Sequence, residues 1–290
     1  MQVHLVDGTY ELFRAYYSKR PPHRAPDGSD KKATLALASA MLALLHDEGE
    51  AVTHVAVAFD NPIRSFRNDL FDGYKTDEGV PPELLAQFDS AEDAVRALGM
   101  AVWSMRDFEA DDALATGAAR FESEVEQVRI LTPDKDLGQC LRGTHVVQVD
   151  WRAKSVVDEE ALLRRRGVRP PSIPDLLALT GDDADGIPGL PGFGEKTASA
   201  LLARYIHLEH IPADPAAWPA VRQAPRLAAT LEERRDDVLL YRQLATLRTD
   251  APIGTLEEAR FLGVPREPFL ALCEALGTGE LRDRPRRWAP

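Results

Sequence analysis

The sequence predicts an α/β fold: a central, mainly parallel sheet with helices on both faces, followed by a helical region. Two observations carry this prediction. The first half of the chain alternates short β-branched runs with segments of helical spacing, which is typical of a parallel sheet covered by helices. Near Gly167 prolines and then glycines interrupt the chain, and only helical patterns follow. We therefore place a boundary after residue 167, which separates 1–167 from 168–290.

Aspartates follow three of the four expected strands. The strands are expected at 3–6, 55–59, 128–131 and 146–149. Asp7, Asp60 and Asp150 directly follow the first, second and fourth of them. In open α/β sheets, ligands bind at the carboxyl ends of the strands, so we expect a ligand site at this edge.

Helical spacing predicts the remaining elements. Within the first region, helices are expected at 33–45, 90–98 and 110–121. In the second region we expect a short helix at 173–179, a helix at 196–205, a connection at 212–225, one long helix or a pair at 227–247, and a loose tail at 282–290.

The composition argues against export and against a membrane span. A chain of 290 residues with 44% hydrophobic content can bury a sizeable core. The sequence reaches Asp7 without a basic segment followed by an apolar stretch, and no apolar run approaches the roughly 20 residues that span a bilayer. Cys140 and Cys273 lack zinc-ligand spacing, so we expect thiols in a reducing cytoplasm.

Nine acidic residues in five groups form a candidate metal site. They are Asp7; Asp60; Glu109, Asp111 and Asp112; Asp134 and Asp136; and Asp182 and Asp185. Two divalent cations held by carboxylates can activate water and stabilise an in-line phosphoryl displacement. Each group alone also has an ordinary explanation as a helix cap, a dipole partner or a solvated turn. Their recurrence in pairs and triples among apolar residues, where unpaired charge is costly, favours the metal site.

The net charge of −12 argues, by itself, against a nucleic-acid ligand, because phosphate contacts need Lys and Arg. If cations neutralise the nine clustered acids, however, the charge falls from −12 to −3. Basic residues are also bunched at 19–32, 164–169 and 282–287, which leaves room for local positive surfaces.

A glycine-rich segment at 186–197 opens a helix and would expose backbone N–H groups to a phosphate. It lacks the four residues that a Walker loop places between its first glycine and Gly-Lys. We interpret the segment as a helix-hairpin-helix element that grips a nucleic-acid backbone without reading its sequence.

Several short motifs occur in a fixed order between residue 1 and about residue 255. They are Leu5-Val6-Asp7-Gly8, Phe59-Asp60, Ser65-Phe66-Arg67, Gly73-Tyr74-Lys75, Phe108-Glu109-Ala110-Asp111-Asp112, Thr132-Pro133-Asp134-Lys135-Asp136-Leu137, Leu179-Thr180-Gly181-Asp182 with the hairpin, and Leu244-Ala245-Thr246-Leu247-Arg248-Thr249-Asp250-Ala251-Pro252. This set resembles the 5′ nuclease family, which includes the amino-terminal domain of bacterial DNA polymerase I and the flap endonucleases.

The resemblance implies a PIN-like catalytic domain with two divalent cations, Mg²⁺ or Mn²⁺. Asp7, Asp60, Glu109 and Asp111 match ligands of the first ion, and Asp134, Asp136, Asp182 and Asp185 match those of the second. Asp111 would lie near both ions, and Asp112 would support them directly or through water.

The resemblance also assigns the contacts with DNA. Arg14, Arg67 and Lys75 match basic residues that face the DNA or the scissile phosphate, and an arch spans about 68–90. The hairpin would hold duplex DNA, with a monovalent cation such as K⁺ on its carbonyls. Its candidate DNA-binding residues are Gly189, Gly192, Gly194, Lys196 and Thr197. Where many relatives continue with an arginine after Lys75, this chain has Thr76-Asp77-Glu78, which weakens the basic lining of the arch.

The implied function is structure-specific hydrolysis of DNA at a free 5′ end, a flap or a junction, by a 5′-3′ exonuclease or flap endonuclease of replication and repair. Because the sequence ends at Pro290, we expect a free-standing cytoplasmic nuclease, with a monomer as the default.

Three other functions compete with this prediction. A haloacid-dehalogenase-type phosphatase would need a second acid two residues after Asp7, where this chain has Thr9. A PIN-type ribonuclease would share the acidic pocket but leave the hairpin unexplained. A non-catalytic DNA-junction binder would not need nine acids that repel one another unless a cation is bound.

Overall fold

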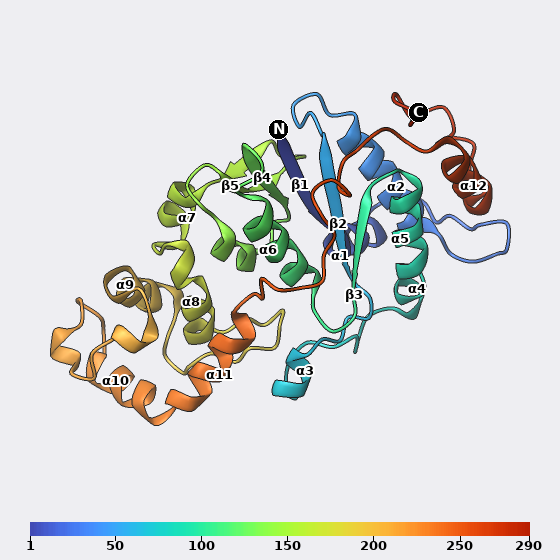
Figure 1. The fold of residues 1–290 in the computed structure, drawn as a ribbon. Coiled ribbons are helices and arrows are strands. Elements are labelled where there is room, and N and C mark those ends of the chain that lie inside the picture. The colour runs from blue at the N-terminus through green and yellow to red at the C-terminus, as the bar shows by residue number, and fades with distance from the viewer.

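The computed structural model describes residues 1–290 and is built around one six-stranded sheet (Figure 1). The strand order is β3-β2-β1-β4-β5-β6. The strands are β1 (Gln2–Asp7), β2 (His54–Asp60), β3 (Ala101–Met105), β4 (Gln127–Leu131), β5 (Val146–Asp150) and β6 (Ser155–Val157). The first five run parallel, and β6 is antiparallel to β5. The predicted α/β class with a mainly parallel sheet is therefore confirmed.

Alternating side chains give the sheet two apolar faces. In β2, Val55, Val57 and Phe59 join one core cluster, while Ala56 and Ala58 join another. The first face is covered by α1 (Gly8–Tyr16), α2 (Lys32–Leu45), α5 (Phe88–Ala97) and α12 (Arg266–Leu276). The second face is covered mainly by α6 (Ala110–Phe121). The strands are thus buried from both sides, as a parallel sheet requires.

The helical region has a core of its own. It comprises α7 (Glu159–Arg166), α8 (Ile173–Thr180), α9 (Glu195–Tyr205), α10 (Ala224–Glu233) and α11 (Arg235–Ala245). The segment expected to be one long helix or a pair is a pair, because the backbone leaves the helical region at Arg234. None of the helices combines the length and the apolar character that crossing a bilayer requires.

The last 40 residues return to the sheet, although the boundary at 167 assigned them to the helical region. Ala251 packs beside α6, and Phe269 of α12 packs on the opposite face. The expectation of a loose tail is wrong, because the backbone N–H of Ala289 donates to Val264 at 2.9 Å and Trp288 packs on Phe269 with ring centroids 5.9 Å apart. The red carboxyl-terminal segment in Figure 1 accordingly lies beside the blue and teal helices.

Candidate active site

The predicted metal-site residues converge at the carboxyl edge of the sheet. The strand order reverses between β1 and β4, and in such sheets the crevice at the reversal point binds ligands. Asp7 ends β1 and also caps α1, because its Oδ1 accepts from Tyr10 N at 2.8 Å. Asp60 ends β2 and accepts from Ala110 N at 2.7 Å, which ties that strand to the start of α6. Helix capping and the candidate site therefore coexist at these positions.

A second group of carboxylates comes from the turn after β4 and the loop after α8. Carboxylate oxygens of Asp136, Asp182 and Asp185 all lie within 4.8 Å of one another. Asp134 stands at the exposed rim, and its Oδ1 accepts from Asp136 N at 2.9 Å.

The loop that carries Asp182 and Asp185 is closed by tight backbone packing. Asp182 and Ile187 exchange backbone hydrogen bonds of 2.7 and 2.8 Å. Gly186 has φ +73, and a Cβ there would lie 2.1 Å from the carbonyl oxygen of Gly73. Only glycine allows this approach, which fixes the loop against the arch.

Lys75 bridges the two groups of carboxylates. Its Nζ lies 2.8 Å from Glu109 Oε2 and 2.9 Å from Asp185 Oδ1. The backbone holds it there, because Lys75 N donates to Asp185 O at 3.0 Å and Asn68 Nδ2 donates to Lys75 O at 2.8 Å. The arch around it contains two short helices, α3 (Arg67–Leu70) and α4 (Pro82–Leu85), and the segment between them is exposed at residues 76–79.

The sequence did not identify some side chains that hold the carboxylates. Lys135 Nζ lies 2.8 Å from Asp182 Oδ2, and Thr132 Oγ1 donates to Asp7 Oδ2 at 2.9 Å. Both lie in the Thr132-Pro133-Asp134-Lys135-Asp136 motif, so the available signal was the position of Lys135 between the two acids and of Thr132 two residues before the first.

Mutual repulsion and burial raise the pKa of most of these acids. Burial raises the pKa of Asp7 to about 7, and the charges of Asp60 and Asp134 add to the rise. Burial also raises the pKa of Asp111 and Asp136 well above the usual range, and the negative charge of Asp134 is the largest repulsive contribution to both. These acids therefore influence one another's ionisation.

Glu109 is the exception among the acids. Burial opposes its ionisation, but the positive charges of Lys75 and Arg67 outweigh burial and lower its pKa to about 2. Both of its oxygens are engaged: Oε1 accepts from Ser65 Oγ at 2.6 Å, and Oε2 lies beside Lys75 and the Tyr74 hydroxyl.

The carboxylate set fits hard divalent cations. Asp136 Oδ1 is buried and has no hydrogen-bond partner, which is costly unless another positive group neutralises it. Asp136 contributes one of three carboxylate oxygens, with Asp182 and Asp185, that lie within 4.8 Å of one another, and oxygen donors are the ligands that Mg²⁺ and Mn²⁺ prefer.

The raised pKa of Asp7 predicts how stability depends on pH. An acid whose pKa rises on folding stabilises the fold fully below its ordinary pKa of 3.8 and loses this contribution as the pH rises through about 7. We expect the Tm in EDTA to fall by several degrees between pH 5 and pH 8. Mg²⁺ should reduce the fall, because it binds the ionised carboxylates. Calorimetry at both pH values checks this, and an equal fall with and without Mg²⁺ would contradict it.

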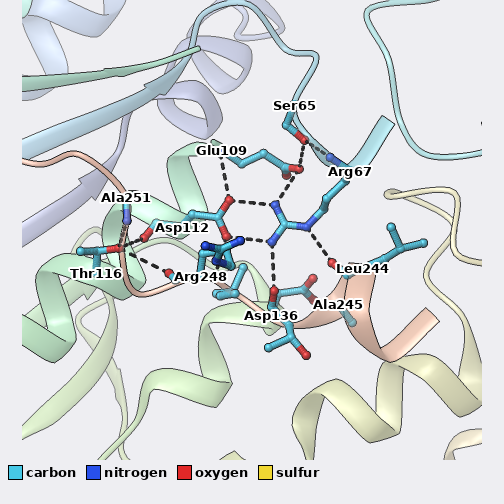
Figure 2. Close-up of polar contacts among 12 residues, drawn as sticks. Ser65, Arg67, Glu109, Asp112, Thr116, Asp136, Leu244, Ala245, Arg248 and Ala251 are labelled. Carbon is cyan, nitrogen blue, oxygen red and sulfur yellow. Dashed lines mark hydrogen bonds and ion pairs between the residues drawn. The ribbon is translucent and has the colours of Figure 1, made fainter. Parts of the chain in front are cut away.

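Arg67 and Asp112 form a buried ion pair outside the open site (Figure 2). Arg67 is 1% exposed, and its NH1 and NH2 donate to the two oxygens of Asp112 at 2.8 and 2.7 Å. Its NH1 also donates to Glu109 at 2.9 Å, and its Nε donates to the carbonyl of Leu244 at 2.8 Å.

This arrangement differs from the roles expected for the two residues. Asp112 also accepts from the backbone N–H groups of Glu109 and Arg248, and it is fully buried, which leaves its oxygens no access to a cation. Arg67 is enclosed in the same way, with 1% of its surface exposed. The pair instead fixes the start of α6, which carries Glu109 and Asp111, to the end of α11.

Arg14 lies on α1, apart from the carboxylates. Its side chain is 42% exposed, and its Nε lies 3.4 Å from Glu11 Oε2. No ion pair joins it to any of the nine predicted acids.

The predicted hairpin is present between α8 and α9. Gly189 and Gly192 have φ of +69 and +89, and a Cβ at Gly189 would lie 2.4 Å from Gly181 N. Gly194 precedes the first residue of α9, Lys196 is exposed, and Thr197 N donates to Gly194 O at 3.0 Å. The first turn of a helix presents N–H groups without intrahelical partners, so this end can bind phosphate.

Two family models divide nearly the whole chain between them. Residues 2–167 match the 5′-3′ exonuclease, N-terminal resolvase-like domain, and residues 168–266 match the 5′-3′ exonuclease, C-terminal SAM fold. The chain belongs to the 5′-3′ exonuclease family. The predicted resemblance is thereby confirmed at the level of the family.

Bacterial DNA polymerases I are among the relatives of this 5′-3′ exonuclease family member. The enzyme of Bacillus caldotenax is 34% identical over 280 residues, which cover 94% of this chain and 31% of the polymerase. That of Rhizobium leguminosarum is 35% identical over 272 residues, which cover 92% of this chain and 26% of the polymerase. The chain thus spans about a third or less of these relatives.

Solved structures share the fold of this family member. A flap endonuclease of bacteriophage T5 in complex with DNA and metal ions aligns with a TM-score of 0.63 at 18% identity, covering 84% of this chain and 89% of that one. The catalytic core of Rad2 in complex with DNA substrate aligns with a TM-score of 0.62 at 15% identity, covering 97% and 90%.

Proposed function

We propose that this protein is a divalent-metal-dependent 5′ nuclease that hydrolyses DNA phosphodiester bonds at a free 5′ end or flap. One observation carries the proposal: the buried Asp136, whose Oδ1 has no hydrogen-bond partner, contributes a carboxylate oxygen that lies within 4.8 Å of carboxylate oxygens of Asp182 and Asp185. Such a cluster suits a cation that neutralises phosphate charge. Family membership and the DNA complexes of the structural relatives support the same function.

The chain offers two sets of ligands. Asp7, Asp60, Asp111 and Glu109 would hold one cation, and Asp134, Asp136, Asp182 and Asp185 would hold the other. When bound, the two cations would supply Lewis-acid stabilisation of the reacting phosphate.

The remaining residues would position the ligands and the DNA. Lys75 stands between the two sets and can neutralise a phosphate oxygen. Arg67 and Asp112 would hold α6 in place and would not touch the DNA. The hairpin would bind the duplex backbone without regard to sequence.

Cleavage of end-labelled substrates tests the proposal. Flapped, nicked and single-stranded DNA, with a flapped RNA as a fourth arm, would be incubated with Mg²⁺ or EDTA and the products sized. We expect Mg²⁺-dependent products with 5′-phosphates from the flapped DNA. Cleavage of RNA alone would indicate a ribonuclease, and duplex binding without products in Mg²⁺ or Mn²⁺ would indicate a non-catalytic junction binder.

The hairpin should contribute affinity for duplex DNA. Gly192 has φ +89, and a Cβ there would lie 3.0 Å from Leu227 Cδ2, so Gly192→Val should distort the turn. We expect Gly192→Val and Lys196→Ala each to weaken duplex binding about three- to tenfold, with a smaller salt dependence for Lys196→Ala. Filter binding on two unrelated sequences in Ca²⁺ checks this. A loss confined to one sequence, or a loss of Mn²⁺ affinity, would contradict it.

The acidic turn of the arch should reduce substrate capture. Asp77 and Glu78 are exposed in the turn after Lys75 and form no ion pair. We expect Glu78→Arg to raise kcat/KM on flapped DNA severalfold at low salt, mainly through KM, because the added charge attracts the strand over a Debye length of roughly 10 Å at 0.1 M salt. A salt series with Asp283→Arg as a distant control checks this. An equal gain for both variants would show that the position of the charge is unimportant.

A further inference from the structure

Two histidines lie on one face of the short 3-10 helix η3 (Leu208–His210), which follows α9 in the helical region. His207 directly precedes η3, and His210 is its last residue. In a 3-10 helix the side chains at positions i and i+3 eclipse one another, so the two rings project from the same face. Their centroids lie 5.9 Å apart. No hydrogen bond or ion pair connects either ring to the nine predicted acids, so the pair is separate from the candidate active site.

The hydrogen bonds of both rings leave the same nitrogen free. His207 Nδ1 lies 2.9 Å from Asp175 Oδ2, and His210 Nδ1 lies 3.1 Å from the carbonyl oxygen of Tyr205. A carboxylate and a carbonyl only accept hydrogen bonds, so Nδ1 is the donor in both rings. In the neutral imidazole the free lone pair is then on Nε2, which has no partner in the protein on either ring. Metal-binding histidines have this arrangement, in which a carboxylate or carbonyl accepts from the other ring nitrogen.

The surroundings of the pair favour a cation. The His207 side chain is 40% exposed and His210 is exposed as well, so an ion can reach both rings from solvent. Behind them, the buried Asp175 lies 3.4 Å from Arg242 NH1, and the same nitrogen lies 2.5 Å from Glu209 Oε1. Two carboxylates therefore face one guanidinium, which leaves a net negative charge beside the neutral rings.

A strained turn fixes the position of His207. Ile206 follows the last residue of α9 with φ +69 and ψ −53, and His207 N donates to Tyr205 O at 2.8 Å. These dihedral angles and this hydrogen bond define a form of the γ-turn that is rare and strained. A β-branched residue rarely adopts a positive φ, and such strain is concentrated at functional sites. The backbone and Asp175 thus hold this ring from two sides.

We propose that His207 and His210 bind one divalent transition-metal ion, Zn²⁺ or a similar ion, through their Nε2 atoms. Imidazole nitrogens suit such ions, whereas Mg²⁺ and Ca²⁺ prefer oxygen ligands. Zinc binds an imidazole nitrogen at about 2.0–2.1 Å, so rings with centroids 5.9 Å apart can share one ion, with water as the other ligands. Through Asp175, which belongs to α8, the ion would tie the end of α9 to α8. This site goes beyond the proposed nuclease function and does not depend on it.

Nuclear magnetic resonance of the histidine ring nitrogens tests the proposal. The full chain has 7 histidines, and their Nδ1 and Nε2 resonances would be followed while Zn²⁺ is added in the presence of excess Mg²⁺. We expect the Nε2 resonances of His207 and His210 to shift together and to saturate at one Zn²⁺ per pair. Their Nδ1 atoms should stay protonated, because Asp175 and the Tyr205 carbonyl keep their hydrogen bonds.

Three variants separate binding by the pair from binding by single histidines. His210→Ala should weaken Zn²⁺ binding at His207 by at least about tenfold, and its Tm in EDTA should equal that of the natural protein because His210 is exposed. Asp175→Asn keeps an acceptor for His207 but loses the charge, so it should weaken binding about tenfold and leave both Nε2 shifts in place. His145→Ala is the matched control: His145 lies apart from the pair, beside Glu122 O, and its loss should leave the titration unchanged.

Three results would overturn the metal assignment. They are Nε2 resonances of the pair that do not move in excess Zn²⁺, a shift of only one of the two rings, or an equal affinity at His207 in His210→Ala and the natural protein. Since the measurement involves no DNA, none of these results bears on the proposed nuclease function, which is judged by the cleavage products alone.

Discussion

Asp182→Asn should lower the rate of flapped-DNA cleavage by at least about a hundredfold while duplex binding persists. Asp182 is 5% exposed and contributes an oxygen to the cluster with Asp136 and Asp185. The amide keeps the acceptor that Ala184 N uses at 3.1 Å, so the loop should remain folded. What it removes is the negative charge of one ligand. Single-turnover rates in Mg²⁺ and duplex binding in Ca²⁺ measure the two effects separately.

Asp183→Asn provides the control for this change. Asp183 is the next residue of the same loop, but it is exposed and lies outside the carboxylate cluster. Because Asp183 is exposed, removing its charge should alter the rate of flapped-DNA cleavage by less than about twofold. Equal rates for the two variants, whether both high or both low, would show that Asp182 has no special role.

Arg67→Met should lower the free energy of unfolding by about 3–5 kcal/mol, because it leaves buried carboxylates without their partner. Arg67 is 1% exposed and binds Asp112, Glu109 and the carbonyl of Leu244. Urea denaturation measures the loss. The double variant Arg67→Met, Asp112→Leu should recover part of it, since neither charge then remains unpaired.

Arg248→Met is the comparison for this prediction. Arg248 lies near the same network, but its side chain is 47% exposed and pairs with Asp250 at the surface. Its replacement should lower the free energy of unfolding by less than about 1 kcal/mol. If Arg67→Met left the stability unchanged and lowered only kcat, Arg67 would be a substrate contact, as the sequence had suggested.

The sequence predicted the parallel sheet because its strands are buried on both faces and therefore appear as apolar runs. The run at 55–59 lies inside β2, and the helix expected at 110–121 has these bounds in the structure. β3 was missed because Ser104 interrupts a short strand at the sheet edge. β6 was missed because it has three residues and one of them is exposed.

The gathering of the acids could be predicted, but their individual environments could not. Asp7 and Asp60 end neighbouring parallel strands, so they must lie at the same edge of the sheet, whatever their side chains contact. The bond between Arg67 and Asp112 joins residues 45 positions apart, and Leu244 contacts Arg67 across 177 positions, so no local pattern reveals them. Burial separates Asp112 from Asp111, although the two are adjacent in the sequence.

The carboxyl-terminal segment was also mispredicted because its contacts are distant in the sequence. Polar residues and prolines at 282–290 suggested a free end, yet Val264 pairs with Trp288 in an isolated bridge. The partner of this segment lies earlier in the chain, and only the tertiary fold brings the two together.

Anomalous diffraction from crystals grown with Mn²⁺ is the most direct test of the claim that these carboxylates hold catalytic cations. We expect one peak among Asp136, Asp182 and Asp185 and a second among Asp7, Asp60 and Asp111, with Lys75 displaced from at least one of its two carboxylate partners. Loss of the first peak in Asp182→Asn crystals would complete the assignment. A pocket without Mn²⁺, at concentrations at which the protein cleaves DNA, would contradict it.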